Sequence, residues 1–185
     1  MNKNNNDRLP YRYPMYLFVG GGVGITLVIN IIVSSVRDAV HLGPFKDRVS
    51  EYSTVSGLKN PAMTNPYVMK PYLKGKIITI DKKENRIDDI YYELPEELRA
   101  TKPEDVGTIV WLEWGEDIVG KYTNGDDATV ITCQVTIIDK SIPTIVDKIS
   151  FEGSQPPDLK KRGDSGSGSM PTEKIINYLQ SFPKK

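Results

Sequence analysis

The uncharged stretch at residues 15–36 limits most strongly what this chain can fold into. It holds 22 consecutive residues without Asp, Glu, Lys or Arg. At about 1.5 Å per residue, a helix of this length reaches roughly 33 Å, enough to cross a hydrocarbon core of about 30 Å. Amphipathic rings favour the headgroup region, and three lie at the upstream end: Tyr11, Tyr13 and Tyr16. The stretch therefore predicts one transmembrane helix.

The glycines in this stretch allow other interpretations. "GGGVG" resembles part of the G-x-G-x-x-G turn that binds dinucleotides, but Gly20 and Gly22 leave Ile25 at the third glycine position. A buried core helix would need a second apolar helix to pack against, and the sequence offers none. A cleaved signal peptide is a further alternative, although its apolar region usually has only about 7–15 residues. The retained membrane helix fits the sequence best.

Within a membrane helix, the glycines create a packing face. Gly20 and Gly24 form a G-x-x-x-G pair, which lets a neighbouring helix approach closely. Asn30 adds a polar group near the middle of the membrane, where it needs a hydrogen-bond partner. A tolerated glycine run, with Asn30 bonded to its own helix, is the alternative. We expect membrane lipid and other transmembrane helices as partners of this segment.

Charge is divided unevenly along the chain. Residues 1–75 carry nine Lys or Arg and four Asp or Glu, whereas residues 76–185 carry fifteen and twenty, so the net charges are +5 and −5. Basic residues beside a span suit anionic headgroups, and an acidic domain argues against nucleic acid as a partner. Cys133 and His41 are the only residues of their kinds. We therefore expect no disulfide, no metal site and no cofactor.

The sequence divides into six segments. These are a polar N-terminal tail (1–14), the transmembrane helix (15–36), a juxtamembrane helix with a proline-rich connector (37–73), an antiparallel β-domain (74–152), a flexible linker (153–170) and a C-terminal helix (171–185). In the third segment, Phe45, Val49 and Tyr52 recur at helical spacing. We expect this juxtamembrane face to lie on the membrane or against a partner.

From Lys74 onward, the apolar residues alternate with a period of two, which is typical of β-strands. The expected strands cover residues 74–81, 86–94, 107–114, 117–123, 128–139 and 145–153. Asn124-Gly125 is the preferred pair for a tight hairpin turn. The predicted fold is mainly β, an antiparallel β-sandwich or small barrel of about six strands. A C-terminal amphipathic helix with Ile175, Leu179 and Phe182 on one stripe is expected to dock on the sheet.

Several motifs resemble catalytic or binding sites, but the sequence does not supply the other features that such sites need. Residues 162–166 read RGDSG, which resembles an integrin-binding loop and the nucleophile segment of trypsin-like peptidases. The second needs a base and an acid beside the serine, and His41 is remote in sequence. Paired carboxylates could act as acid and base or bind calcium, but they fall at expected turns or strand ends: Asp88/Asp89, Glu116/Asp117 and Asp126/Asp127.

The sequence favours a non-catalytic, single-pass membrane protein whose β-domain serves as a binding, scaffold or accessory subunit. Its layout is similar to that of small bacterial membrane-anchored proteins. One alternative is a membrane-tethered hydrolase that uses carboxylates on the sheet rim. Another is a β-barrel module that binds a small ligand in a cavity lined by Trp111, Trp114 and tyrosines. A short N-terminal tail commonly stays inside, so we expect the β-domain to be extracytoplasmic.

Overall fold

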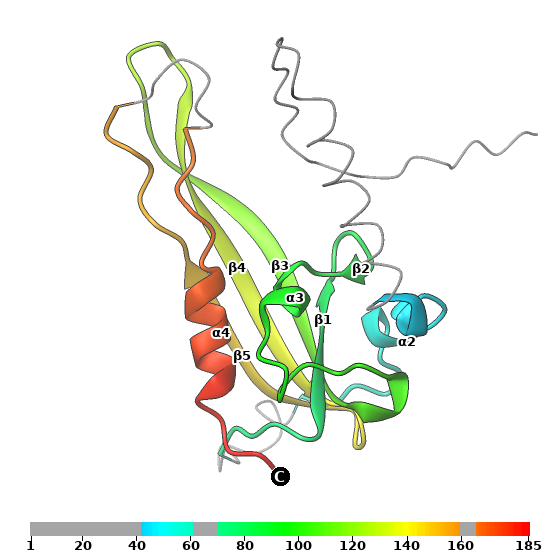
Figure 1. Ribbon diagram of the computed structural model, residues 1–185. Coiled ribbons are helices and arrows are strands. Elements are labelled where there is room, and N and C mark those ends of the chain that lie inside the picture. Colours follow the sequence, from blue (N-terminus) through cyan, green and yellow to red (C-terminus); the bar gives the residue numbers. More distant parts are fainter. Residues whose placement is uncertain (1–41, 61–69, 160–165) are drawn as a thin grey trace, which may run out of the picture. The chain divides into compact units, whose positions relative to one another are not determined.

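The computed structural model describes residues 42–60, 70–159 and 166–185, which belong to one compact unit, Val40–Lys185. Strands dominate this unit, and they form a five-stranded sheet with the order β2-β1-β3-β4-β5 (Figure 1). The strands are β1 (Lys76–Asp81), β2 (Arg86–Ile87), β3 (Val106–Lys121), β4 (Asp127–Asp139) and β5 (Thr144–Glu152). The helices are η1 (Gly43–Phe45), α2 (Val49–Ser53), α3 (Ile90–Glu93), η3 (Pro103–Asp105) and α4 (Thr172–Gln180).

The sheet is mixed, which corrects the expected antiparallel pairing. β1 pairs antiparallel with β2 but parallel with β3, whereas β3, β4 and β5 follow one another antiparallel. A parallel pair needs a long crossover, and residues 82–105 supply it. Part of that crossover is anchored on β1, because the N–H of Ile77 donates to Leu98 and its carbonyl accepts from Ala100. The prediction of a mainly β fold is confirmed, with five strands in this sheet instead of about six.

Two expected strands differ in extent. The strand predicted at residues 86–94 is only the two-residue β2, followed by the short helix α3. Its apolar residues fit a helical turn, because Ile87, Ile90, Tyr91 and Leu94 are separated by three, one and three positions. Conversely, the two strands predicted at 107–114 and 117–123 form the single strand β3.

Both faces of the sheet are covered where β1, β3 and β4 lie together. One hydrophobic cluster joins Val110, Val135 and neighbouring residues to Ile175 and Leu179 of α4. A second cluster joins residues from the sheet's other face to η1 and α2: Ile78, Ile80, Ile109 and Ile138 pack with Phe45 and Tyr52. In the described part of the chain, helices and loops therefore cover the sheet where the sandwich prediction expected a second sheet.

The C-terminal helix is confirmed. Ile175 and Leu179 of α4 are buried, and Phe182 packs beside them. Tyr178 donates a hydrogen bond to Asp147 of β5 and stacks edge-on against Phe151, so polar and aromatic contacts hold the helix to the sheet. The predicted stripe is thus the docking face.

Candidate functional site

The residues predicted to pack in the membrane, Gly20, Gly24 and Asn30, lie outside the described residues. Within residues 42–60, 70–159 and 166–185, no helix combines the length and the apolar character that a membrane crossing requires. The transmembrane segment at 15–36 therefore stays a prediction from the sequence.

The predicted juxtamembrane face is part of the folded unit. Phe45 and Tyr52 are fully buried, and Val49 packs beside them on the second hydrophobic cluster. The Phe45 ring meets the rings of Tyr52 and Tyr91 edge to face, with centroids 6.4 Å and 6.1 Å apart, respectively. The spacing of these three residues reflects packing on the sheet, in contrast to the expected contact with lipid or a partner.

The predicted carboxylate pairs lie at three different places. Asp88 and Asp89 follow β2, Glu116 and Asp117 lie within β3, and Asp126 and Asp127 lie at the β3–β4 turn. Lys121 binds Asp127 at 2.7 Å, and Arg86 lies 3.9 Å from Asp89. Among the described residues, no group of three or more His, Cys, Asp or Glu side chains is placed to hold a metal ion.

Asp88 is buried, which the sequence did not indicate. Its carboxylate accepts hydrogen bonds from the Trp114 indole at 2.7 Å and from the Ile90 backbone at 2.9 Å. Burial raises the pKa of Asp88, while these two bonds oppose the rise. A buried carboxyl with a raised pKa is a candidate general acid. Here, however, both oxygens are occupied, because one accepts from Ile90 of α3 and the other from Trp114 of β3. An aspartate two residues before a helical turn is a capping signal that could have revealed it.

Cys133 lies beside this carboxylate in the core. Its thiol is fully buried, and burial raises its pKa to about 12, with Asp88 adding to the effect. A thiol in this state is a poor nucleophile. Cys133 therefore has a structural role in the first hydrophobic cluster.

The two tryptophans lie on opposite faces of the sheet. Trp111 packs against the second hydrophobic cluster, where its indole donates to the Tyr52 carbonyl at 2.7 Å. Trp114 packs against the first cluster and reaches Asp88. Residues three apart in a strand point to opposite sides. A single cavity lined by both indoles, as the small-ligand alternative requires, is therefore not formed.

A second polar network lies at the β4–β5 turn. Tyr72 donates to Asp139 at 2.8 Å, the Ser141 hydroxyl donates to the same carboxylate at 2.6 Å, and Lys74 donates to the Ser141 oxygen at 2.6 Å. Some hydrolases pair serine with lysine. Burial acts to raise the pKa of Asp139, but the bonds from Ser141 and Tyr72 lower it, so this carboxylate is a weak base. The network fixes the turn without activating the serine.

The most exposed part of the sheet is the arm, which we define as residues 113–131, where β3 and β4 continue past β1 (Figure 1). Seven consecutive residues of β3, 115–121, are exposed. Ile118 and Val119 remain 64% and 51% accessible, and the register of the ladder shifts at this point. Bulges of this kind re-aim side chains and are common near functional sites.

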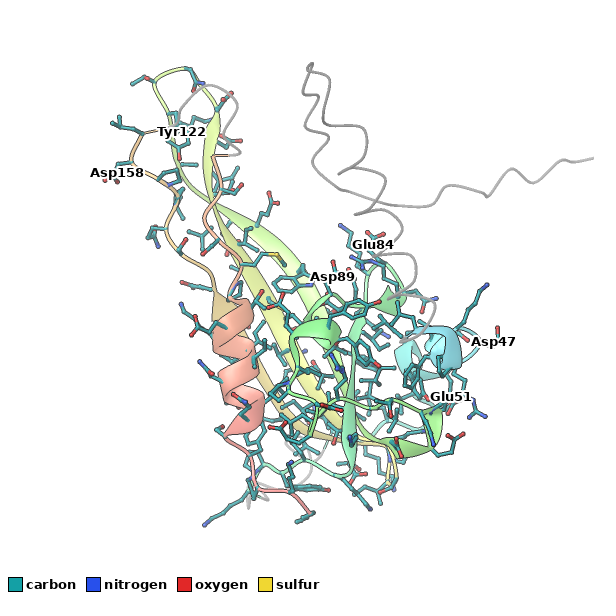
Figure 2. The ribbon with its side chains drawn as sticks, in the orientation of Figure 1. Asp47, Glu51, Glu84, Asp89, Tyr122 and Asp158 are labelled. Atoms are coloured by element: carbon teal, nitrogen blue, oxygen red, sulfur yellow. The ribbon has the colours of Figure 1, made fainter. Side chains whose placement is uncertain are left out.

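One edge of the arm is covered by the strap, which we define as residues 153–159 and 166–170. On β4, Thr129 exchanges backbone hydrogen bonds with Gly166 and Gly168, and the Ile131 carbonyl accepts from Gly153 at 2.7 Å. At the turn, Tyr122 donates to the Pro157 carbonyl at 2.8 Å, and Figure 2 shows Tyr122 and Asp158 at this end of the arm. The described parts of the predicted flexible linker are thus held by specific hydrogen bonds.

The other edge of the arm, along β3, is open among the described residues. In the part of the chain that the structure describes, the last backbone bond on this side joins the Lys82 N–H to the Leu112 carbonyl at 2.9 Å. Beyond Leu112, β3 has no strand partner on this side among the residues that the structure describes. An exposed strand edge of this kind is a template for pairing with another chain.

In comparisons with known proteins, no family model, curated protein or solved structure matches this chain.

Proposed function

We propose that this chain is a non-catalytic, single-pass membrane protein whose β-domain serves as a binding, scaffold or accessory subunit in a membrane protein assembly. The uncharged stretch at residues 15–36 carries the membrane part of this proposal. Two observations support the accessory role. The described hydrogen bonds of the polar clusters in the β-domain hold the fold together, and the arm is exposed.

The polar contacts favour a binding role over a hydrolase. Asp88 and Asp139 are 4% and 2% exposed, and each is satisfied by hydrogen bonds from its own neighbours. The other predicted pairs, Glu116/Asp117 and Asp126/Asp127, are exposed and lie within β3 and at the β3–β4 turn. By contrast, the arm presents aliphatic side chains and open backbone groups together, which is what a protein partner can use.

Anchoring is tested first, by washing membranes from expressing cells with alkaline carbonate. A protein that spans the bilayer stays in the pellet until detergent is added. Release into the carbonate supernatant would contradict the anchor. A C-terminal reporter fusion tests the proposed extracytoplasmic orientation, which an active cytosolic reporter would reverse.

Assembly is tested with the glycine face. Replacing Gly20 and Gly24 by leucine leaves the segment apolar, so insertion is expected to persist, while bulkier side chains hold a neighbouring helix away. Co-purification from mild detergent should then lose specific partners. The matched control replaces Ile25 and Ile29 by leucine, which changes shape on a different helix face at little cost in hydrophobicity. Equal recovery of partners by both double variants would remove the glycine face from the proposal.

A further inference from the structure

The open edge of the arm has a defined hydrogen-bonding pattern. The Gly107 carbonyl accepts from Lys140, so this odd-numbered residue of β3 faces β4, whereas the Leu112 carbonyl accepts from Lys82 on the β1 side. Backbone groups alternate in direction along a strand. Trp114 and Glu116 therefore direct their N–H and C=O groups outward, into the position that β1 occupies further down β3.

The charge of the arm indicates what can occupy that position. Residues 113–131 contain one basic side chain, Lys121, which Asp127 already binds at 2.7 Å. They contain five acidic side chains: Glu113, Glu116, Asp117, Asp126 and Asp127. Glu116 lies on one face of β3, and Glu113 and Asp117 lie on the other, because side chains alternate along a strand. A strand added here meets carboxylates on both faces.

This charge disfavours a second copy of the same arm. Two β3 edges that paired antiparallel about a two-fold axis near Glu116 would place carboxylates opposite carboxylates, which is destabilising. Anionic membrane surfaces and nucleic acids would meet the same repulsion. A cationic segment instead gains from the field of the arm.

We propose that the open edge of β3, residues 113–118, binds an extended segment of a partner protein that carries lysine or arginine, by adding it as a strand to the sheet. The backbone of β3 supplies hydrogen bonds, the carboxylates select the charge, and the exposed Ile118 provides apolar contact at the end of the site. This inference rests on the proposed function, because it assigns the partner chemistry of the accessory domain.

The test uses the ¹⁵N-labelled full chain in zwitterionic micelles, titrated with the heptapeptide Val-Lys-Lys-Val-Lys-Lys-Val. Its lysines fall on both faces of an extended strand. Binding should shift the amide resonances of Trp114 and Glu116 and slow their hydrogen exchange, with smaller effects at Glu84 on the β1–β2 turn. The peptide Val-Glu-Glu-Val-Glu-Glu-Val should not bind, and N-methylation of alternate residues should abolish binding by the lysine peptide.

Two pairs of variants separate backbone from charge. Glu116→Pro removes an outward N–H that β4 does not use, and it should weaken binding by about tenfold or more. Glu116→Gln keeps that N–H. The double variant E116Q/D117N should weaken binding by about 2- to 30-fold at low salt, and less at physiological salt. The matched control E96Q/E97Q removes the same charge from the exposed crossover and should leave binding unchanged.

Three results would overturn the inference. They are no binding of the lysine peptide at millimolar concentration, equal binding of the acidic peptide, and amides of Trp114 and Glu116 that are already protected without peptide. The last would mean that another segment of this chain occupies the edge. None of these results affects carbonate extraction or co-purification, so failure here is distinguishable from failure of the proposed function.

Discussion

At the scale of single residues, Asp139 shows how a buried charge is held in this fold. Its carboxylate receives the Tyr72 hydroxyl and the Ser141 hydroxyl and backbone N–H, which compensates for the loss of water. Burial and the hydrogen bond to Asp139 also raise the pKa of Tyr72 to about 12. The pair is therefore most stable with the carboxyl ionised and the phenol neutral.

Replacing Tyr72 by phenylalanine should lower the free energy of unfolding at neutral pH by about 1.5–3 kcal/mol, because a buried bond to a charged group is lost. The pKa of Asp139 is lowered in the folded state, so its contribution is present above the ordinary carboxyl pKa of about 4 and is lost as pH falls through the folded value. The difference between wild type and variant should shrink correspondingly below about pH 4.

Urea denaturation across the pH range measures this effect. Tyr122→Phe is the matched control, since its hydroxyl bonds to Pro157 at an exposed site and should contribute at most about 1 kcal/mol. Equal and pH-independent effects of the two variants would show that Asp139 gains nothing special from Tyr72.

At the scale of elements, the two segments of the strap depend on glycine for their close approach to each other. A Cβ at Gly168 would lie 1.8 Å from the Ser154 carbonyl oxygen, and a Cβ at Gly153 would lie 1.8 Å from that of Ser169. These backbones also share hydrogen bonds, including Ser154 N–H to the Ser169 carbonyl at 3.1 Å. No side chain fits without separating the two segments.

Gly168→Ala should therefore destabilise the strap, at a cost of about 1–3 kcal/mol for forced overpacking. The amides of Thr129 and Gly153 should exchange faster with solvent, since their bonds to the strap and to β4 would loosen. Gly120→Ala in β3 is the control, because the nearest atom to a Cβ at this position is the Ala128 Cβ at 4.0 Å. Unchanged exchange in Gly168→Ala would mean that the strap does not need this contact.

At the scale of the whole molecule, the β-domain has its own core. Residues 40–185 form a separate compact unit, and the hydrophobic clusters on the two faces of the sheet are built from described residues within it. Phe45 and Tyr52 contribute to that core, so the folded unit begins well before the strand predicted at residue 74.

Deleting residues 1–39 should therefore leave a cooperatively folding domain, with a Tm within a few degrees of that of the full chain and unchanged circular dichroism. The same deletion should remove the protein from the membrane fraction if residues 15–36 are the anchor. A further deletion to residue 54 should lower the Tm strongly, because it removes Phe45 and Tyr52 from the core. A truncated domain that fails to unfold cooperatively would contradict this division.

The sequence by itself determined the local features of this protein. Alternation located β1, β4 and β5, and a helical stripe located α4 with Ile175 and Leu179 inward. Asn124-Gly125 marked the hairpin turn, where Gly125 has φ of +88°, a conformation that favours glycine. These patterns need only neighbouring residues, because period and turn chemistry act over a few positions.

Tertiary structure alone decided which polar residues are buried and which strands pair. Asp88 was expected at a turn or strand end, yet it is buried and accepts a hydrogen bond from Trp114, 26 residues further along. Thr136 is polar, yet it is buried because the sheet is covered on both sides at this point. The parallel pairing of β1 with β3, and with it the open edge beyond Leu112, arises from a crossover of more than twenty residues. Such contacts join residues that are far apart in the chain, so they produce no repeating pattern among neighbouring residues from which they could be predicted.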